Sequence, residues 1–170
     1  MIDNINIRQA TVKDIESIAK IKATGWQNAY RGIIDDEYLD AMSVKEQIEK
    51  YSFSYKLKDI FIAENQNEVV GFCRFYDYNA PAYDDKEIDC EIREIYIKPD
   101  LKRMGIGSQL FKYTLDYFKS IGKKKLYLGC FKENYNSRKF YEKMGGILGK
   151  ELELEVGNKK YKVVSYIYEL

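Results

Sequence analysis

The chain has 170 residues, and its 28 Lys and Arg side chains nearly balance 27 Asp and Glu side chains, with no His. Near-neutral charge gives no general electrostatic reason to bind nucleic acid, and the length suits a single domain over residues 1–170. Without histidine, Ser-His-Asp triads, Cys-His dyads and histidine metal sites are excluded. Proton transfer must then use carboxylate, tyrosine, lysine, cysteine or water, and we expect no metal cofactor.

Hydrophobic periodicity and turn residues divide the chain into strands and helices. Thr11 with Asp14, and Ser43 with Glu46, are spaced as capping boxes and mark two helix starts. The predicted elements, in chain order, are a strand over 4–10, helices over 12–27, 35–42 and 43–51, a hairpin of strands 59–64 and 68–76, a loop over 79–89, a strand over 90–97, a helix over 105–121, a strand over 124–130, a helix over 137–144, and a hairpin of strands 150–156 and 160–170. This order predicts an α+β fold, in which helices pack on a mixed sheet.

The stretch LKRMGIGSQL (101–110) has the features of a phosphate-binding turn. It follows a predicted strand and opens a predicted helix, whose first amides lack partners and whose dipole favours an anion. Gly105 and Gly107 allow close approach of the backbone and positive φ angles. Lys102 and Arg103 add positive charge, so the stretch predicts a diphosphate site.

Other phosphate-binding motifs fit this stretch less well. A P-loop requires GxxxxGK[ST], which is missing here, and a Rossmann fingerprint requires a third glycine where this chain has Leu110. A nucleotide-binding oxidoreductase is therefore disfavoured. A glycine-rich helix start without any ligand is the alternative interpretation.

Two motifs resemble those of the GNAT superfamily of acyl-CoA N-acyltransferases. EIREIYIKPDLKRMGIGSQLF (91–111) is similar to the family's motif A, a strand and turn followed by [QR]xxGx[GA] at a helix start. NYNSRKFYEKMGG (134–146) is similar to motif B, NxxAxxFYxxxGF. The matching positions in the second motif are Asn134, Ser137, Phe140, Tyr141 and Gly145. The chain departs from the patterns at Lys102, where Gln or Arg is usual, and at Gly146, where an aromatic residue is usual.

The resemblance extends over nearly the whole chain and implies the family's fold and cofactor. That fold is a seven-stranded, mostly antiparallel sheet flanked by helices, with strands four and five splayed apart. It implies acetyl-CoA as acyl donor, with the diphosphate on the backbone of 103–108 and the pantetheine arm added like a strand along 95–97. The residues that it assigns to the cofactor are Ile95, Tyr96, Ile97, Lys102, Arg103, Met104, Gly105, Ile106, Gly107, Ser108, Asn134, Ser137 and Tyr141.

The reaction that the resemblance implies is attack of a primary amine on the thioester in a ternary complex. Glu91 matches the carboxylate that some relatives use as a base, with Glu94 as second choice and a solvated or ion-paired role as the alternative. Strand alternation predicts that Glu91 shares a face with Ile95 and Ile97, opposite Glu94. Tyr141 matches the family's general acid for the leaving thiolate, or it packs only. A backbone amide of 96 or 97 could polarise the thioester carbonyl.

The acceptor site is less well defined by the sequence. The segment 25–43 lines this site in relatives, so Trp26 and Tyr30 face the substrate or belong to the core. Acidic side chains near the expected entrance favour a small cationic, polyamine-like amine over the alternatives of a peptide N-terminus or an amino-sugar antibiotic. These acidic side chains are Asp35, Asp36, Glu37, Asp84, Asp85, Glu87 and Asp89.

The remaining features point to a cytoplasmic protein without nucleic-acid or membrane partners. No apolar run is long enough to span a membrane, and the first residues lack a signal peptide's apolar core. Cys73, Cys90 and Cys130 are widely spaced, which favours buried thiols over disulfides, and an acyl-cysteine route is disfavoured because no activator is evident. The run 123–125 reads as a solvated helix end. A GNAT-fold sensor that binds acyl-CoA without turnover, and a homodimer, both stay open.

Overall fold

The structure is a computed structural model that describes residues 5–52, 54–77 and 85–170. The strands are β1 (Asn6–Gln9), β2 (Ile60–Asn65), β3 (Glu68–Tyr76), β4 (Cys90–Ile97), β5 (Lys125–Phe131), β6 (Ile147–Val156) and β7 (Lys159–Glu169), and the helices are α1 (Ile15–Ala29), α2 (Asp36–Ala41), α3 (Val44–Tyr51), α4 (Ile106–Ser120) and α5 (Tyr135–Lys143). The strands form one seven-stranded sheet in the order β1-β2-β3-β4-β5-β7-β6. The predicted fold class is confirmed.

The centre of the sheet opens between β4 and β5. All other neighbouring strands pair antiparallel, whereas β4 and β5 run parallel and pair only at Cys90 with Leu126 and at Glu91 with Tyr127. β4 continues to Ile97 with β3 as its partner on the other side. The two central strands therefore diverge after their first two pairs, as the resemblance implied.

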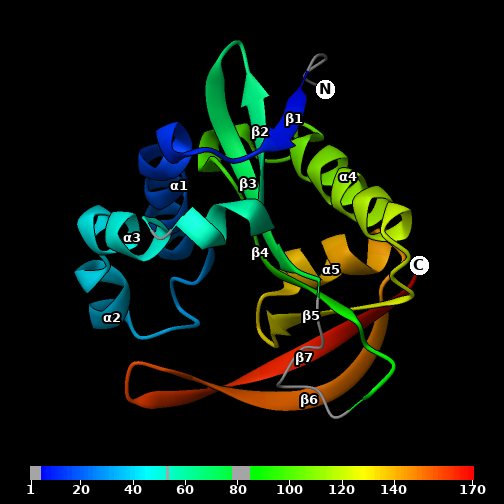
Figure 1. Ribbon diagram of the computed structural model, residues 1–170. Coiled ribbons are helices and arrows are strands. Elements are labelled where there is room, and N and C mark those ends of the chain that lie inside the picture. The colour runs from blue at the N-terminus through cyan, green and yellow to red at the C-terminus, as the bar shows by residue number, and fades with distance from the viewer. Residues whose placement is uncertain (1–4, 53, 78–84) are drawn as a thin grey trace.

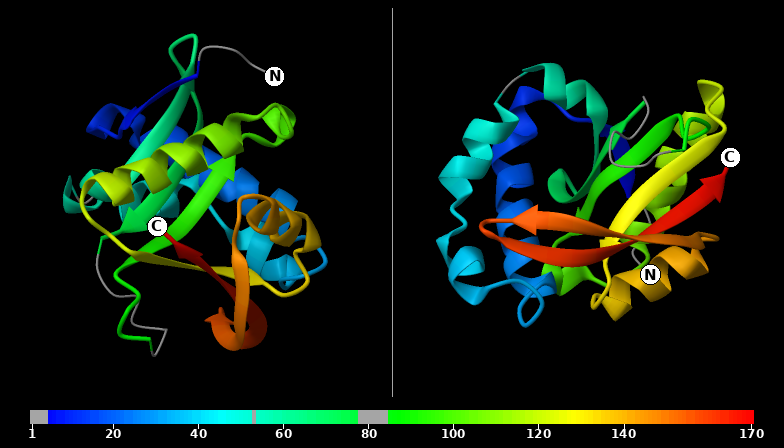
Figure 2. Two further views of the ribbon diagram at one scale, coloured as in Figure 1. Left: turned by 90° about the vertical axis from the view of Figure 1, so that its right-hand side faces the viewer. Right: turned by 90° about the horizontal axis from the view of Figure 1, so that it is seen from below.

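Helices cover both faces of the sheet. α1, α2 and α3 lie on one side, whereas α4 and α5 lie on the other (Figure 1). The hairpin of β6 and β7 extends from the sheet toward α2 (Figure 2). At its tip, Gly157 lies against the ring of Tyr38, and Lys159 forms an ion pair with Asp35.

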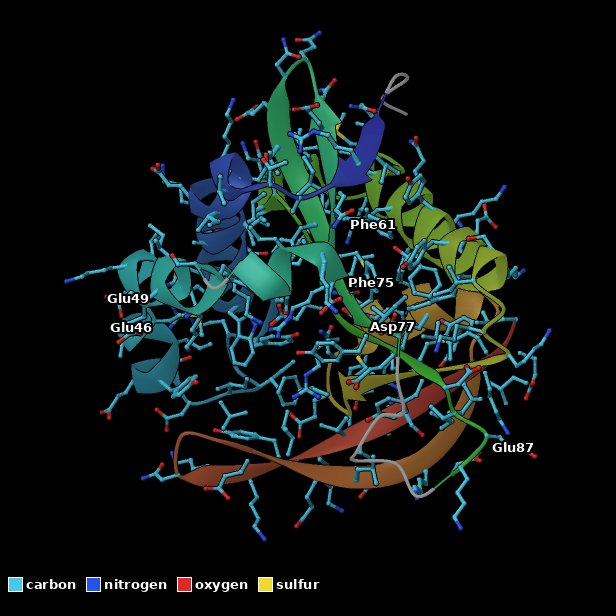
Figure 3. The ribbon with its side chains drawn as sticks, in the orientation of Figure 1. Glu46, Glu49, Phe61, Phe75, Asp77 and Glu87 are labelled. Atoms are coloured by element: carbon cyan, nitrogen blue, oxygen red, sulfur yellow. The ribbon has the colours of Figure 1, made fainter. Side chains whose placement is uncertain are left out.

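Two apolar clusters hold these layers together. On the α4 face, Phe61 and Phe75 pack against each other with ring centroids 4.7 Å apart, and Phe118 of α4 meets Phe75 edge-on at 5.5 Å. Figure 3 shows Phe61 and Phe75 between the central strands and α4. On the α1 face, Ile18 and Ile21 pack on Phe72. Aromatic pairs of this kind favour edge-on or offset contacts, which fixes the spacing of the layers.

The helix starts follow the predicted chemistry, but several boundaries shift. The Thr11 amide donates to Asp14 at 2.8 Å, and the Glu46 amide donates to Ser43 at 3.1 Å. The first predicted helix begins with a 3-10 turn before α1, and a further 3-10 turn was not predicted before β2. β6 begins three residues early because Ile147 already pairs with β7, ahead of a register shift in the hairpin.

The three cysteines are buried thiols, as the sequence predicted. Cys73, Cys90 and Cys130 are free and buried. Across the described ranges, every helix is too short or too polar to cross a bilayer.

Candidate active site

A cleft of about 420 Å³ lies where β4 and β5 diverge. Its walls come from α1, β4, β5, α5 and the hairpin of β6 and β7, so distant parts of the sequence meet there. The sequence-predicted residues that line it are Trp26, Tyr30, Glu91, Tyr96, Asn134, Ser137 and Tyr141. The predicted diphosphate loop and Ile95 and Ile97 lie outside its lining.

A β-bulge in β4 decides which side chains of that strand reach the cleft. Arg74 of β3 pairs with Glu94, but the next residue of β3 pairs with Ile92, so Arg93 is an extra residue on β4. Such a bulge reverses the alternation of side chains along one strand. Glu91 and Glu94 consequently line the same cleft, while Ile95 packs into the α4-side core. The prediction that Glu91 and Glu94 lie on opposite faces is wrong.

Glu91 is a buried carboxylate with a single ionic partner among the described residues. One of its oxygens accepts from Arg93 Nη1 at 3.1 Å. The Glu91 side chain is 4% exposed, whereas Arg93 is 49% exposed. Because Arg93 is half-exposed, solvent screens its ion pair with Glu91. A cation that enters the cleft can therefore replace Arg93 at Glu91.

Glu94 has both carboxylate oxygens engaged. One forms an ion pair with Lys22 of α1, and the other accepts from the Tyr51 hydroxyl of α3 at 2.6 Å. Burial acts to raise the pKa of Glu94, but Lys22 and Arg74 together bring it below its usual value. Glu94 stays ionised and fully hydrogen-bonded, which makes it unsuited to accept a proton.

Lys22 is a buried charged residue of the cleft that the sequence analysis did not single out. Its ammonium lies 4.6 Å from the ring centroid of Trp26 and 4.9 Å from that of Tyr96, in cation–π geometry. The side chain is 8% exposed. A signal was present in the sequence, because Lys22 stands four residues after Ile18 on the apolar face of its helix, where a charge requires a partner.

Trp26 and Tyr30 line the cleft and pack in the core as well. Their rings meet edge-on at 5.0 Å, and the Tyr30 ring also meets Phe131 at 4.8 Å. The hydroxyls of Tyr30 and Tyr96 share a hydrogen bond of 3.0 Å. Both rings therefore form part of the cleft wall and pack in the core, and contact with a substrate stays a prediction.

Tyr141 enters the cleft from the C-terminal half of α5. Its ring packs against Phe111 and Tyr166, with centroids 6.2 and 5.8 Å away. Burial raises the pKa of Tyr141 well above its usual value, so the phenol keeps its proton at any physiological pH. The hydroxyl of Tyr168 anchors this turn by donating to the Tyr141 carbonyl at 2.9 Å. A Cβ at Gly146 would lie 2.6 Å from that hydroxyl, which accounts for glycine there.

Asn134 and Cys130 have structural roles at the start of α5. Asn134 Oδ1 accepts from the Ser137 amide at 3.2 Å and thereby caps the helix. Burial raises the pKa of the Cys130 thiol to about 12, so it stays protonated and gives no support to an acyl-cysteine route.

The loop before α4 presents main-chain donors and positive charge. Gly105 caps the helix at φ 87°, and Arg103 also has a positive φ of 67°. The first hydrogen bond of α4 runs from the Gln109 amide to the Gly105 carbonyl at 3.1 Å, so the amides of 106–108 precede the helix's own bonds. Arg103 and Ser108 are exposed. Lys102 donates to Asn28 of α1 at 2.9 Å, which ties the loop to the acceptor side.

Within the residues that the structure describes, the acidic side chains predicted near the entrance do not line the cleft itself, but Asp35 and Glu37 line a smaller pocket that shares Tyr38, Val156 and Gly157 with it. Asp35 pairs with Lys159, and Asp85 and Glu87 both pair with Lys125. None of the described members of that set lines the cleft, and Asp84 lies outside the described residues.

Residues 152–157 also line the cleft. Leu152 and Val156 pack into apolar clusters, whereas Glu153 and Glu155 alternate with them and are exposed, and Glu153 pairs with Lys160.

The chain matches the acetyltransferase (GNAT) family over residues 24–146, and it belongs to that family. A Bacillus subtilis protein named as an uncharacterized N-acetyltransferase is 28% identical over 132 residues, which cover 76% of this chain and 73% of the relative. A spermidine N(1)-acetyltransferase of Thermoplasma acidophilum is 24% identical over 145 residues, covering 84% and 88%. The crystal structure of PaiA N-acetyltransferase from the same organism, in complex with coenzyme A, superposes with a TM-score of 0.73 at 20% identity over 98% of this chain and all of that one. The protein is an acetyl-CoA-dependent N-acetyltransferase.

Proposed function

We propose that the protein transfers an acetyl group from acetyl-CoA to a primary amine of a small cationic, polyamine-like molecule, by direct attack in a ternary complex. The observation that carries this proposal is that Glu91 and Tyr141 line one cleft, at the point where β4 and β5 diverge. A carboxylate and a protonated phenol are the two groups that this reaction requires.

The cofactor is proposed to bind along β4 and at the start of α4. The amides of 106–108, with the side chains of Lys102 and Arg103, would hold the diphosphate. A Cβ at Gly107 would meet only ordinary contacts, the nearest at 3.6 Å from Ile97, so the protein's own packing does not require glycine there. Glycine does leave the backbone open to a phosphate. The pantetheine arm would bond to the β4 main chain over 95–97, where β5 has diverged.

The proton path follows from the two side chains. An alkylamine with a pKa of about 10.4 must lose its proton first, which costs roughly 4–5 kcal/mol at neutral pH. Glu91 takes one proton from the ammonium group, and the neutral amine nitrogen then bonds to the thioester carbon. The C–S bond breaks, Tyr141 gives its proton to the departing thiolate, and the second proton lost by the nitrogen returns to Tyr141 through water. An amide of 96 or 97 would polarise the thioester carbonyl.

The charge of the cleft favours a cationic acceptor. Its charged lining residues are Glu91, Glu94, Glu153, Glu155, Lys22 and Arg93. Glu153 and Glu155 are exposed and Glu94 is paired with Lys22, so Glu91, whose partner Arg93 is half-exposed, is the carboxylate that favours an incoming ammonium group. A relative named as a spermidine acetyltransferase supports the same acceptor class.

CoA release with a panel of acceptors tests this function. The panel contains spermidine, monoamines, amino sugars and a short peptide with a free N-terminus. We expect fastest turnover with the polyamine. If only the peptide is acetylated, the acceptor class is a peptide N-terminus and not a polyamine. Calorimetric binding of acetyl-CoA without turnover of any acceptor would indicate a sensor instead of an enzyme.

A further inference from the structure

The cleft contains two neighbouring carboxylates in very different states. Because of the β4 bulge, Glu91 and Glu94 line the same wall. Glu91 has only the half-exposed Arg93 as its ionic partner among the described residues, whereas Glu94 is engaged at both oxygens by Lys22 and Tyr51. An incoming ammonium group would find one carboxylate open to exchange and one already occupied.

Lys22 is held in place from several sides. Its ammonium pairs with Glu94 and lies over the rings of Trp26 and Tyr96. An alkylammonium ligand would bind to the same combination of aromatic faces and a carboxylate. Because Lys22 is tethered to α1, it occupies the site at a high effective concentration that a dissolved amine cannot match.

We propose that Lys22 determines specificity by occupying Glu94, so that a protonated acceptor amine binds productively at Glu91 alone. This inference rests on the proposed function and deepens it. Lys22 does not touch the reacting atoms; it acts through Glu94 by withholding a competing carboxylate from the acceptor. Without Lys22, the same aromatic and acidic surroundings become a second ammonium site, at which bound substrate lies away from the proton path.

Steady-state kinetics of Lys22→Met with a polyamine acceptor test the proposal. Non-productive binding at Glu94 lowers kcat and KM together and leaves kcat/KM nearly unchanged. We expect both constants to fall about tenfold, the size of one charge-assisted hydrogen bond in an equilibrium constant. Lys22→Met/Glu94→Gln removes the second site and should bring both constants back near the wild-type values. Lys22→Arg, which keeps the charge, should behave like wild type.

Lys20→Met serves as the matched control, because Lys20 is on the same helix but exposed and paired with Glu16. If kcat of Lys22→Met falls while KM holds or rises, or if the double variant does not recover, the proposal is wrong. Removing one partner of a buried pair can unfold a protein. In that event Lys22→Gln, which is uncharged but still polar, leaves the charge of Glu94 without its cation and takes its place with the same expected pattern. Wild-type protein that acetylates no amine would refute the proposed function, which is a separate outcome.

Discussion

The start of α4 and the acceptor wall of the cleft present ligands with different chemistry. At α4 the donors are main-chain amides around Gly105, with exposed basic side chains beside them. At the acceptor wall the groups are side chains from α1 and β4, such as Lys22 and Glu94, which are buried and paired. Under the proposed function, backbone donors would bind any diphosphate of suitable shape, whereas the paired side chains would discriminate between amines.

This difference has consequences for mutation. Main-chain donors at the helix start can be lost only through a change of backbone conformation or through proline, which has no N–H, and a nearby negative charge can oppose their ligand. A side-chain site can be changed one group at a time. Substitutions at α4 should therefore affect the cofactor alone, and substitutions in the cleft should separate turnover from acceptor binding.

Gly105→Glu is expected to have the largest effect. A non-glycine residue at φ 87° is strained by about 1–2 kcal/mol, and the carboxylate repels the diphosphate whose charge-assisted hydrogen bonds contribute about 1.5–3 kcal/mol each. Calorimetry should show acetyl-CoA affinity falling more than about 1,000-fold by these sums. Gly122→Glu is the control, since φ is 80° at the other end of the same helix. Equal losses in both variants would refute the diphosphate site.

Glu91→Gln should reduce turnover about 100- to 1,000-fold at pH 7, as loss of a general base does. Without the base, the rate should rise with pH toward the pKa of the free amine, about 10.4. A pH–rate profile measured with saturating acetyl-CoA checks this. A variant with normal turnover at pH 7 would exclude Glu91 as the base.

Tyr141→Phe should lower kcat about 100-fold and leave acetyl-CoA affinity nearly intact, because only one proton donor is lost. Burial raises the pKa of Tyr141, so its acid form is present below that raised pKa. Wild-type kcat should consequently show no loss from this group up to at least about pH 10. Tyr135→Phe, an exposed position on the same helix, is the control. Unchanged kcat in Tyr141→Phe would remove the acid role.

The contrast between a contiguous main-chain site and a side-chain wall built by long-range contacts also explains which features could be predicted from the sequence. The proposed phosphate-binding turn is contiguous, and its glycines and helix start are local features, so its conformation at Gly105 could be predicted directly. The order of strands followed from alternation and from the family resemblance. Tyr141 could be placed because it lies in a second contiguous motif.

The acceptor wall could not be predicted because long-range pairing builds it. Lys22 and Glu94 are 72 positions apart, and no local sequence pattern indicates that they pair. The bulge at Arg93 exists only in pairing with β3, so simple alternation placed Glu91 on the face of Ile95, whereas it lies on the face of Glu94. Within the acidic set, Asp85 and Glu87 pair with Lys125, a partner that is remote in sequence.

The smallest expected effect is that of Glu155→Gln, which probes the outer rim of the cleft. Glu155 is exposed, so a solvent-screened contact with a distal ammonium contributes about 0.2–1 kcal/mol. KM for a polyamine should rise about two- to fivefold with kcat unchanged, and KM for a monoamine should stay constant. The rise in KM for the polyamine should become smaller at high salt. Glu151→Gln removes the same charge from the same strand outside the cleft lining and is the control. A rise for the monoamine as well would mean that β6 shapes the cleft without binding a second charge.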